Sequence, residues 1–156
     1  MATVKEYIRS LKNVEKELKK EIPHYLTKKG TIMTAVKYRL YNRGLDGYGK
    51  KMGKYTDQTI SRKKKNARFR ITSHVTLADT GTWRDNLLLK VDGDTMFLDN
   101  KMTSLTNKLI NGGGKHQNPP YGQGIIELSR DEVMIAESLI EDFINKKFKG
   151  LPIIID

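Results

Sequence analysis

The chain has 156 residues, no cysteine and a formal net charge of +11 at pH 7. This length suits one domain with one hydrophobic core, and the lack of cysteine excludes disulfides, thiolate nucleophiles and cysteine-based zinc sites. No apolar run approaches the roughly 18 residues that a membrane span needs, and the first ten residues lack the apolar core of a signal peptide. We therefore expect a single domain over residues 1–156 that is assembled in the cytoplasm and makes no contact with membranes.

The positive charge is concentrated in the middle of the chain. Residues 43–70 carry ten basic and two acidic side chains, whereas residues 71–156 carry nine basic and twelve acidic ones. A chain with such unlike parts can bind nucleic acid, an acidic protein surface or another copy of itself. The charge distribution favours a binding role and leaves the partner open.

Residues 1–42 have the pattern of a helical arm. Thr3 and Glu6 stand at capping-box spacing, which is typical of a helix start. An apolar stripe follows at three- and four-residue steps and consists of Val4, Ile8, Leu11, Val14, Leu18 and Ile22. Proline is tolerated in the first turn of a helix, so we expect a second helix to begin at Pro23. We therefore predict a kinked or two-part arm that ends near Gly44. The apolar stripe of its second part consists of Leu26, Ile32, Met33, Val36 and Leu40.

Residues 43–76 contain four glycines and ten basic residues and show no sustained period of 3.6 or 2 residues. We predict a basic extended loop here. Structureless segments of this length are uncommon inside a compact domain, so we expect a partner to order it.

Residues 77–128 are predicted to form a β-hairpin and loops. Two apolar runs, residues 87–91 and 95–99, flank the turn sequence Asp92-Gly93-Asp94, which is typical of a hairpin. Residues 101–124 are rich in glycine, asparagine and proline, so we expect another extended loop.

Residues 129–156 are predicted to form a helix and a short strand. Ser129 and Glu132 repeat the capping-box spacing, and Gly150 and Pro152 end the helix. Its wide apolar face consists of Val133, Ala136, Leu139, Ile140, Phe143 and Ile144. Residues 151–155 are apolar enough to add a strand to their own sheet or to a neighbour's. The expected fold is α+β, with an N-terminal helical arm, a small, mainly antiparallel β-sheet with long loops, and a C-terminal amphipathic helix packed on that sheet.

The sequence gives no sign of catalysis, and we expect no catalytic residue, metal or cofactor. Asp92 and Asp94 have the character of turn residues, and the acids of residues 129–149 lie on the polar side of a helix. Nucleophile-elbow and P-loop motifs are absent, and the three histidines never form a spaced ligand pair. A small hydrolase would need an essential acid, and the sequence nominates none.

The best binding candidates lie in the basic segment. Cations can meet phosphates there and aromatic rings can stack on bases, but the same side chains can also dock on protein, which we favour. The candidate residues are Lys50, Lys51, Lys54, Tyr55, Arg62, Lys63, Lys64, Lys65, Arg68 and Arg70.

Three segments of the chain together carry a resemblance. Residues 47–63 (GYGKKMGKYTDQTISRK), residues 77–87 (LADTGTWRDNL) and the pair Pro119-Pro120 resemble, in order and spacing, the phage virion-morphogenesis or tail-completion family. The matching positions are Lys54, Tyr55, Thr59, Arg62, Leu77, Thr80, Gly81, Leu87, Pro119 and Pro120. The chain departs from the pattern at Trp83, where the family has a smaller aliphatic residue, and at Tyr121-Gly122, which replace an arginine and an aromatic residue.

The resemblance implies a structural subunit and no enzyme. Such proteins form rings, commonly dodecamers, between portal and tail in the phage neck and surround the DNA channel. The implied partners are further copies of the chain, the portal protein and other neck or tail proteins, with possible nonspecific contact to packaged DNA. A nonspecific DNA-binding protein that uses residues 43–70 stays open as the alternative. We also expect Gly81 to form a turn and Trp83 to lie in the core.

Overall fold

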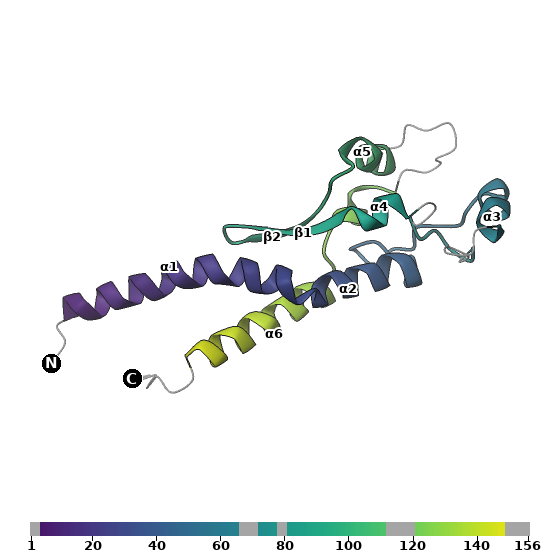
Figure 1. Ribbon diagram of the computed structural model, residues 1–156. Coiled ribbons are helices and arrows are strands. Elements are labelled where there is room, and N and C mark those ends of the chain that lie inside the picture. Colours follow the sequence, from purple (N-terminus) through teal and green to yellow (C-terminus); the bar gives the residue numbers. More distant parts are fainter. Residues whose placement is uncertain (1–3, 66–71, 78–80, 112–120, 149–156) are drawn as a thin grey trace.

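The computed structural model describes residues 4–65, 72–77, 81–111 and 121–148. It has an α+β fold, as expected, in which helices accompany one two-stranded antiparallel sheet within the described residues. The molecule is elongated, with the long helix α1 projecting at one end and the short helix α3 at the other (Figure 1). The expected cap at Thr3 and the strand at residues 151–155 lie outside the described residues.

The helical arm has two parts, and its break lies at a different residue from the predicted one. Helix α1 (Val4–Lys29) runs through Pro23, and Gly30 ends it with a left-handed conformation at φ 68°. Glycine adopts this conformation without a steric penalty, whereas proline in a long helix costs one backbone hydrogen bond that neighbouring turns and packing can offset. The expected helix start at Pro23 is therefore wrong.

The second part of the arm ends at Gly44, as predicted. Helix α2 (Thr31–Lys37) continues into the π-helix η1 (Tyr38–Arg43), and Gly44 follows with φ 65°. A Cβ atom on Gly44 would lie 2.2 Å from Cδ2 of His74, so this position requires glycine for its space as well as for its backbone angle.

The predicted hairpin is confirmed. Strand β1 (Leu87–Asp92) pairs with β2 (Thr95–Asn100) from Leu87 opposite Asn100 to Asp92 opposite Thr95. Gly93 takes a positive φ of 56° in the two-residue turn, which fits the twist of the paired strands.

Two helices lie where the sequence predicted only loops. Helix α3 (Asp57–Lys64) is part of the segment expected to be extended, and helix α5 (Thr103–Asn111) is part of the second expected loop. The short helix α4 (Thr82–Asp85) and the 3-10 helix η2 (Gln123–Ile126) add further order to residues 77–128. Helices this short are marginal in isolation, so tertiary contacts stabilise them more than helix propensity does.

The last helix begins as predicted. In α6 (Arg130–Lys147), the Ser129 hydroxyl accepts from the Glu132 N–H, and the Glu132 carboxylate accepts from the Ser129 N–H. Acidic residues lie in its first turn and lysines in its last, which complements the helix dipole.

Helix α6 packs chiefly on α1 and α2 rather than directly on the hairpin. The rings of Tyr25 and Phe143 lie 4.9 Å apart, and Lys147 lies 2.7 Å from Glu21. The hydrogen bond to Glu21 raises the pKa of the Lys147 ammonium. An open groove lies between α6, α1 and the tip of the hairpin.

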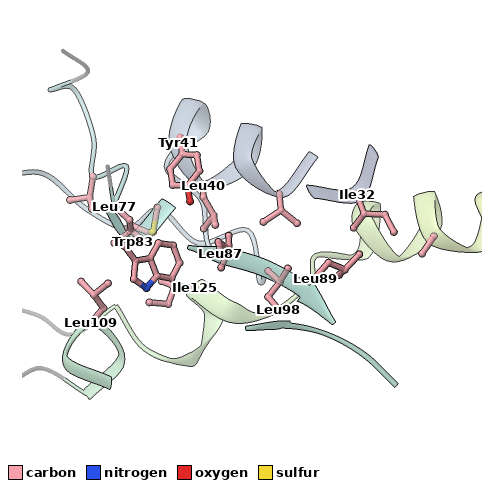
Figure 2. Packing of buried hydrophobic residues seen from close by; sticks show 14 of the residues in the cluster. Ile32, Leu40, Tyr41, Leu77, Trp83, Leu87, Leu89, Leu98, Leu109 and Ile125 are labelled. Atoms are coloured by element: carbon pink, nitrogen blue, oxygen red, sulfur yellow. The ribbon is translucent and has the colours of Figure 1, made fainter. Parts of the chain in front are cut away.

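The core lies at the centre of the molecule, where the second part of the arm meets the hairpin and α4 (Figure 2). Trp83 is 3% exposed, which confirms the expectation that it is a core residue. The other fully covered apolar side chains come from every part of the chain and include Ile32, Val36, Leu40, Leu87, Leu98, Leu109 and Ile125.

Candidate functional site

The basic segment carries the residues that the sequence nominated for binding, and its helix α3 has a defined start. The Thr56 side chain accepts from the Thr59 N–H, and Asp57 lies in the first turn. Arg62, Lys63 and Lys64 occupy the last turn, where cations interact favourably with the helix dipole.

Tyr55 attaches α3 to the rest of the molecule. Its hydroxyl lies 2.9 Å from the Thr76 hydroxyl and accepts from the Thr76 N–H at 2.8 Å. The Val75 N–H also donates to the carbonyl of Gly53 at 3.0 Å. Tyr55 is half-buried and serves as an anchor, which speaks against the expectation that its ring is free to stack on a base.

Lys63 differs from the other nominated cations because it is buried. Its side chain is 1% exposed, and its ammonium lies 4.8 Å from the centre of the Tyr55 ring. A buried lysine cannot reach a partner's surface, so its nomination as a docking contact is wrong. Arg62, Lys64 and Lys65 are exposed on the same helix.

The glycine-rich turn before α3 is folded rather than extended. The Asp46 carboxylate is 6% exposed and accepts from the N–H groups of Tyr48 and Lys50 at 3.0 and 2.8 Å. The Gly47 N–H donates to the carbonyl of Gly124 at 2.7 Å, which joins this turn to η2. Lys50 and the neighbouring Lys51 and Lys54 are exposed, and the turn holds their backbone in place.

A buried ion pair connects this turn to helix α6. Arg39 of η1 donates from Nε and from one terminal nitrogen to the two oxygens of Glu132, at 2.7 and 3.1 Å. The same guanidinium donates to the carbonyls of Leu45 and Glu127 at 3.1 and 2.9 Å. The bidentate geometry and the two further hydrogen bonds to backbone carbonyls make this pair a structural joint. From the sequence, Glu132 is recognisable only as part of a helix cap.

Gly81 and Trp83, the described members of the nominated motif residues, have structural roles. Gly81 has φ 83° and precedes α4, as expected for a turn glycine. The Trp83 ring N–H donates to the Thr106 hydroxyl at 3.0 Å, and the Asn100 amide donates to the Trp83 carbonyl at 2.7 Å. Trp83 thus ties α4 to β2 and α5. Leu77 is buried with a positive φ of 51°, a strained conformation for a residue with a side chain.

Five of the nominated residues lie outside the described part of the chain: Arg68, Arg70, Thr80, Pro119 and Pro120. Among residues 4–65, 72–77, 81–111 and 121–148, the structure has no group of three histidine or acidic residues that could hold a metal ion. Within the same residues, no helix is long and apolar enough to span a membrane.

The arrangement therefore offers an exposed set of cations on a preformed support. The support consists of the Asp46 turn, the Tyr55 anchor and the buried Lys63. The exposed cations, which we call the basic surface, are Lys50, Lys51, Lys54, Arg62, Lys64 and Lys65.

Comparison of the chain with known protein families, with curated proteins and with solved structures finds no match.

Proposed function

We propose that this chain is a structural subunit of a phage head-to-tail connector, a neck-ring or tail-completion protein that forms a ring between portal and tail around the DNA channel. It acts by binding further copies of itself, the portal protein and other neck or tail proteins, and it performs no catalysis. It works as part of the virion neck after assembly in the host cytoplasm. The resemblance of residues 47–63, 77–87 and 119–120 to that family supports this proposal.

The observation that carries the proposal is the presence of two unlike surfaces at opposite ends of the molecule. The basic surface includes α3 at one end, while α1 projects at the other end with apolar residues uncovered (Figure 1). Ile8 and Leu11 of α1 are 48% and 51% exposed. A ring needs two different surfaces on each subunit, because its contacts are head-to-tail.

The basic surface acts as a preformed dock. The turn at Asp46 and the anchor at Tyr55 fix its backbone within the single chain. The sequence predicts that a partner orders residues 43–76, and in the described residues 44–65 these contacts come from the chain itself. A rigid surface loses less conformational entropy on binding than a flexible loop.

Charge reversal on the basic surface tests the proposal. Lys54, Lys64 and Lys65 are exposed, so Lys54→Glu, Lys64→Glu and Lys65→Glu together should leave the circular dichroism spectrum and the melting temperature nearly unchanged. The triple variant should fail to assemble into rings or particles, as seen by electron microscopy of complemented phage. Lys63 stays unchanged because it is buried.

A matched control reverses three exposed cations elsewhere. Lys101, Lys108 and Arg130 lie outside the basic surface, and their replacement by glutamate should leave assembly intact. Normal particles from the triple variant would show that the basic surface takes no part in assembly. Absence of the chain from purified necks would refute the proposed function itself.

Nonspecific DNA binding is the second candidate, and the exposed cations of α3 favour it. Duplex binding through phosphates loses affinity with salt at a slope of about −0.9 for each phosphate contact. A salt titration of the purified chain with free duplex therefore separates the two. A steep slope that disappears in the triple variant would favour DNA binding over protein docking.

A further inference from the structure

The apolar stripe of α1 continues beyond the part of the helix that the rest of the chain covers. Leu26 is 3% exposed and Leu18 and Ile22 are half-buried, whereas Leu11 and Ile8 are 51% and 48% exposed. Figure 1 shows the cause, because the first half of α1 extends past both the hairpin tip and the end of α6. A stripe of helical period on a solvated helix end indicates a surface that another chain covers.

A groove suited to such a stripe lies on the same molecule. It has a volume of about 630 Å³ between α1, the hairpin tip and the first half of α6. Its apolar lining includes Leu18, Ile22, Val91, Phe97, Val133 and Ile140. Phe97 and Val133 are 39% and 38% exposed, so the groove is accessible from solvent.

The groove and the projecting helix end also differ in charge. Four acidic residues line the groove: Glu15, Asp94, Glu127 and Glu137. Lys19 is the cation in the lining, and it pairs with Glu15 at 2.8 Å. Residues 4–12, which include Ile8 and Leu11, carry three basic residues, Lys5, Arg9 and Lys12, and one acidic residue, Glu6, a net charge of +2. An apolar stripe with basic flanks therefore matches an apolar groove with acidic flanks.

The two surfaces cannot meet within one molecule. Residues Glu15 to Leu26 of α1 form a wall of the groove, and the uncovered residues belong to the same continuous helix. A helix cannot fold back on itself without breaking. An α1 end that fills the groove must therefore come from another chain, and a second copy brings it.

We propose that the first turns of α1 of one copy, with Ile8 and Leu11 at their centre, lie in the groove between α1, the hairpin and α6 of the next copy. This inference builds on the proposed ring-forming function and names a second contact, separate from the basic surface, by which copies join. The contact is heterologous, so it propagates from copy to copy and closes into a ring where the rotation allows it.

The apolar segment at residues 151–155 is a competing occupant. Asp156 follows it directly and would bring a negative charge to an acidic groove, which favours the basic helix end instead. The two occupants are distinguished by substitutions in the full-length chain.

Self-association of the purified full chain, measured by analytical ultracentrifugation and native mass spectrometry, tests the proposal. Ile8→Glu with Leu11→Glu changes only the helix end, and Val133→Glu with Phe97→Glu changes only the groove. All four residues are exposed, so both variants should keep the circular dichroism spectrum of the parent chain. Each variant alone should associate at least tenfold more weakly than the parent chain.

Mixing the two variants provides the decisive measurement. A helix-end variant keeps its groove and a groove variant keeps its helix end, so a heterologous contact predicts a 1:1 heterodimer that grows no further. No heterodimer in the mixture would overturn the proposal. So would a parent chain that stays monomeric at all concentrations, or loss of association on Ile153→Asp with Ile154→Asp while the helix-end variant still associates.

The outcomes also separate this inference from the proposed function. Normal neck particles from the helix-end variant would overturn the contact and leave the connector function intact. A confirmed heterodimer from a chain that is absent from neck particles would refute the connector function and leave the contact intact.

Discussion

At the scale of single residues, the joint between Arg39 and Glu132 holds two distant parts of the chain together. Arg39 is 6% exposed and Glu132 is 2% exposed, and Glu132 also caps α6 through the Ser129 N–H. The Glu132 carboxylate therefore both binds Arg39 of the π-helix and caps the start of the last helix. The basic surface depends on this joint, because the guanidinium also binds the carbonyl of Leu45 at the start of that turn.

Replacing Glu132 by glutamine should destabilise the chain strongly. The amide keeps the size of the side chain but leaves the Arg39 charge buried without a counter-charge, and such a loss costs about 3 to 5 kcal/mol. Urea unfolding followed by circular dichroism measures the change. Glu141→Gln, at an exposed position of the same helix, should alter stability by about 0.5 kcal/mol or less. Equal stability of the two variants would contradict the structural role of the pair.

At the scale of elements, two glycines end the two parts of the arm in the same left-handed conformation but in different surroundings. Gly30 and Gly44 have φ values of 68° and 65°. A Cβ atom on Gly30 would meet nothing within 4 Å, whereas one on Gly44 would lie 2.8 Å from the Val75 carbonyl as well as against the His74 ring. Alanine substitutions at these two sites therefore compare the cost of backbone strain alone, at Gly30, with the cost of strain plus steric overlap, at Gly44.

We expect Gly30→Ala to cost about 1 to 2 kcal/mol, the price of a left-handed conformation for a residue with a side chain. Gly44→Ala should cost more, because His74 and the backbone at Val75 must also move. Thermal unfolding of both variants checks the order. A smaller decrease in melting temperature for Gly44→Ala than for Gly30→Ala would mean that the segment at His74 is not packed as described.

The elements that the sequence predicted correctly are those that bury a periodic face. The arm, the hairpin and α6 each repeat apolar residues at their own period, so their type follows from the pattern alone. Helix α3 has one apolar residue, Ile60, and its order comes from the burial of Lys63 against Tyr55, a contact that only the fold creates. Helix α5 carries a stripe at Leu105, Leu109 and Ile110 that could have been found, but the turn-rich residues around it favoured a loop.

The candidate site was predictable only in part for a similar reason. Exposed cations can be found in a sequence as a charge cluster, which is how Lys54, Lys64 and Lys65 were nominated. Whether one lysine within the cluster is buried depends on packing, and Lys63 was therefore misassigned. The groove could not be predicted, because its walls come from three elements that lie far apart in the sequence.

At the scale of the whole molecule, the elongated shape leaves the first half of α1 beyond the hairpin tip and the end of α6, as far as the described residues show. Isolated helices shorter than about 12 to 15 residues are marginal in water, so this half should open frequently in a single copy. The second half contacts α6 through the Tyr25–Phe143 ring pair and the Lys147 ion pairs to Glu17 and Glu21. The second half of α1 is therefore packed on α6, whereas its first half projects into solvent.

Hydrogen exchange followed by mass spectrometry should reveal this division. In dilute solution, the amides of residues 5–14 should exchange much faster than those of residues 22–29, because this end of α1 projects beyond the other described elements. At concentrations where copies associate, protection should rise in residues 5–14 and in residues 91–97 of the hairpin together, since the proposed contact covers both. The exposed turn at residues 48–51 provides the internal control, and its exchange should not change with concentration. Slow exchange of residues 5–14 at every concentration would contradict the description of α1 as a helix whose first half projects into solvent.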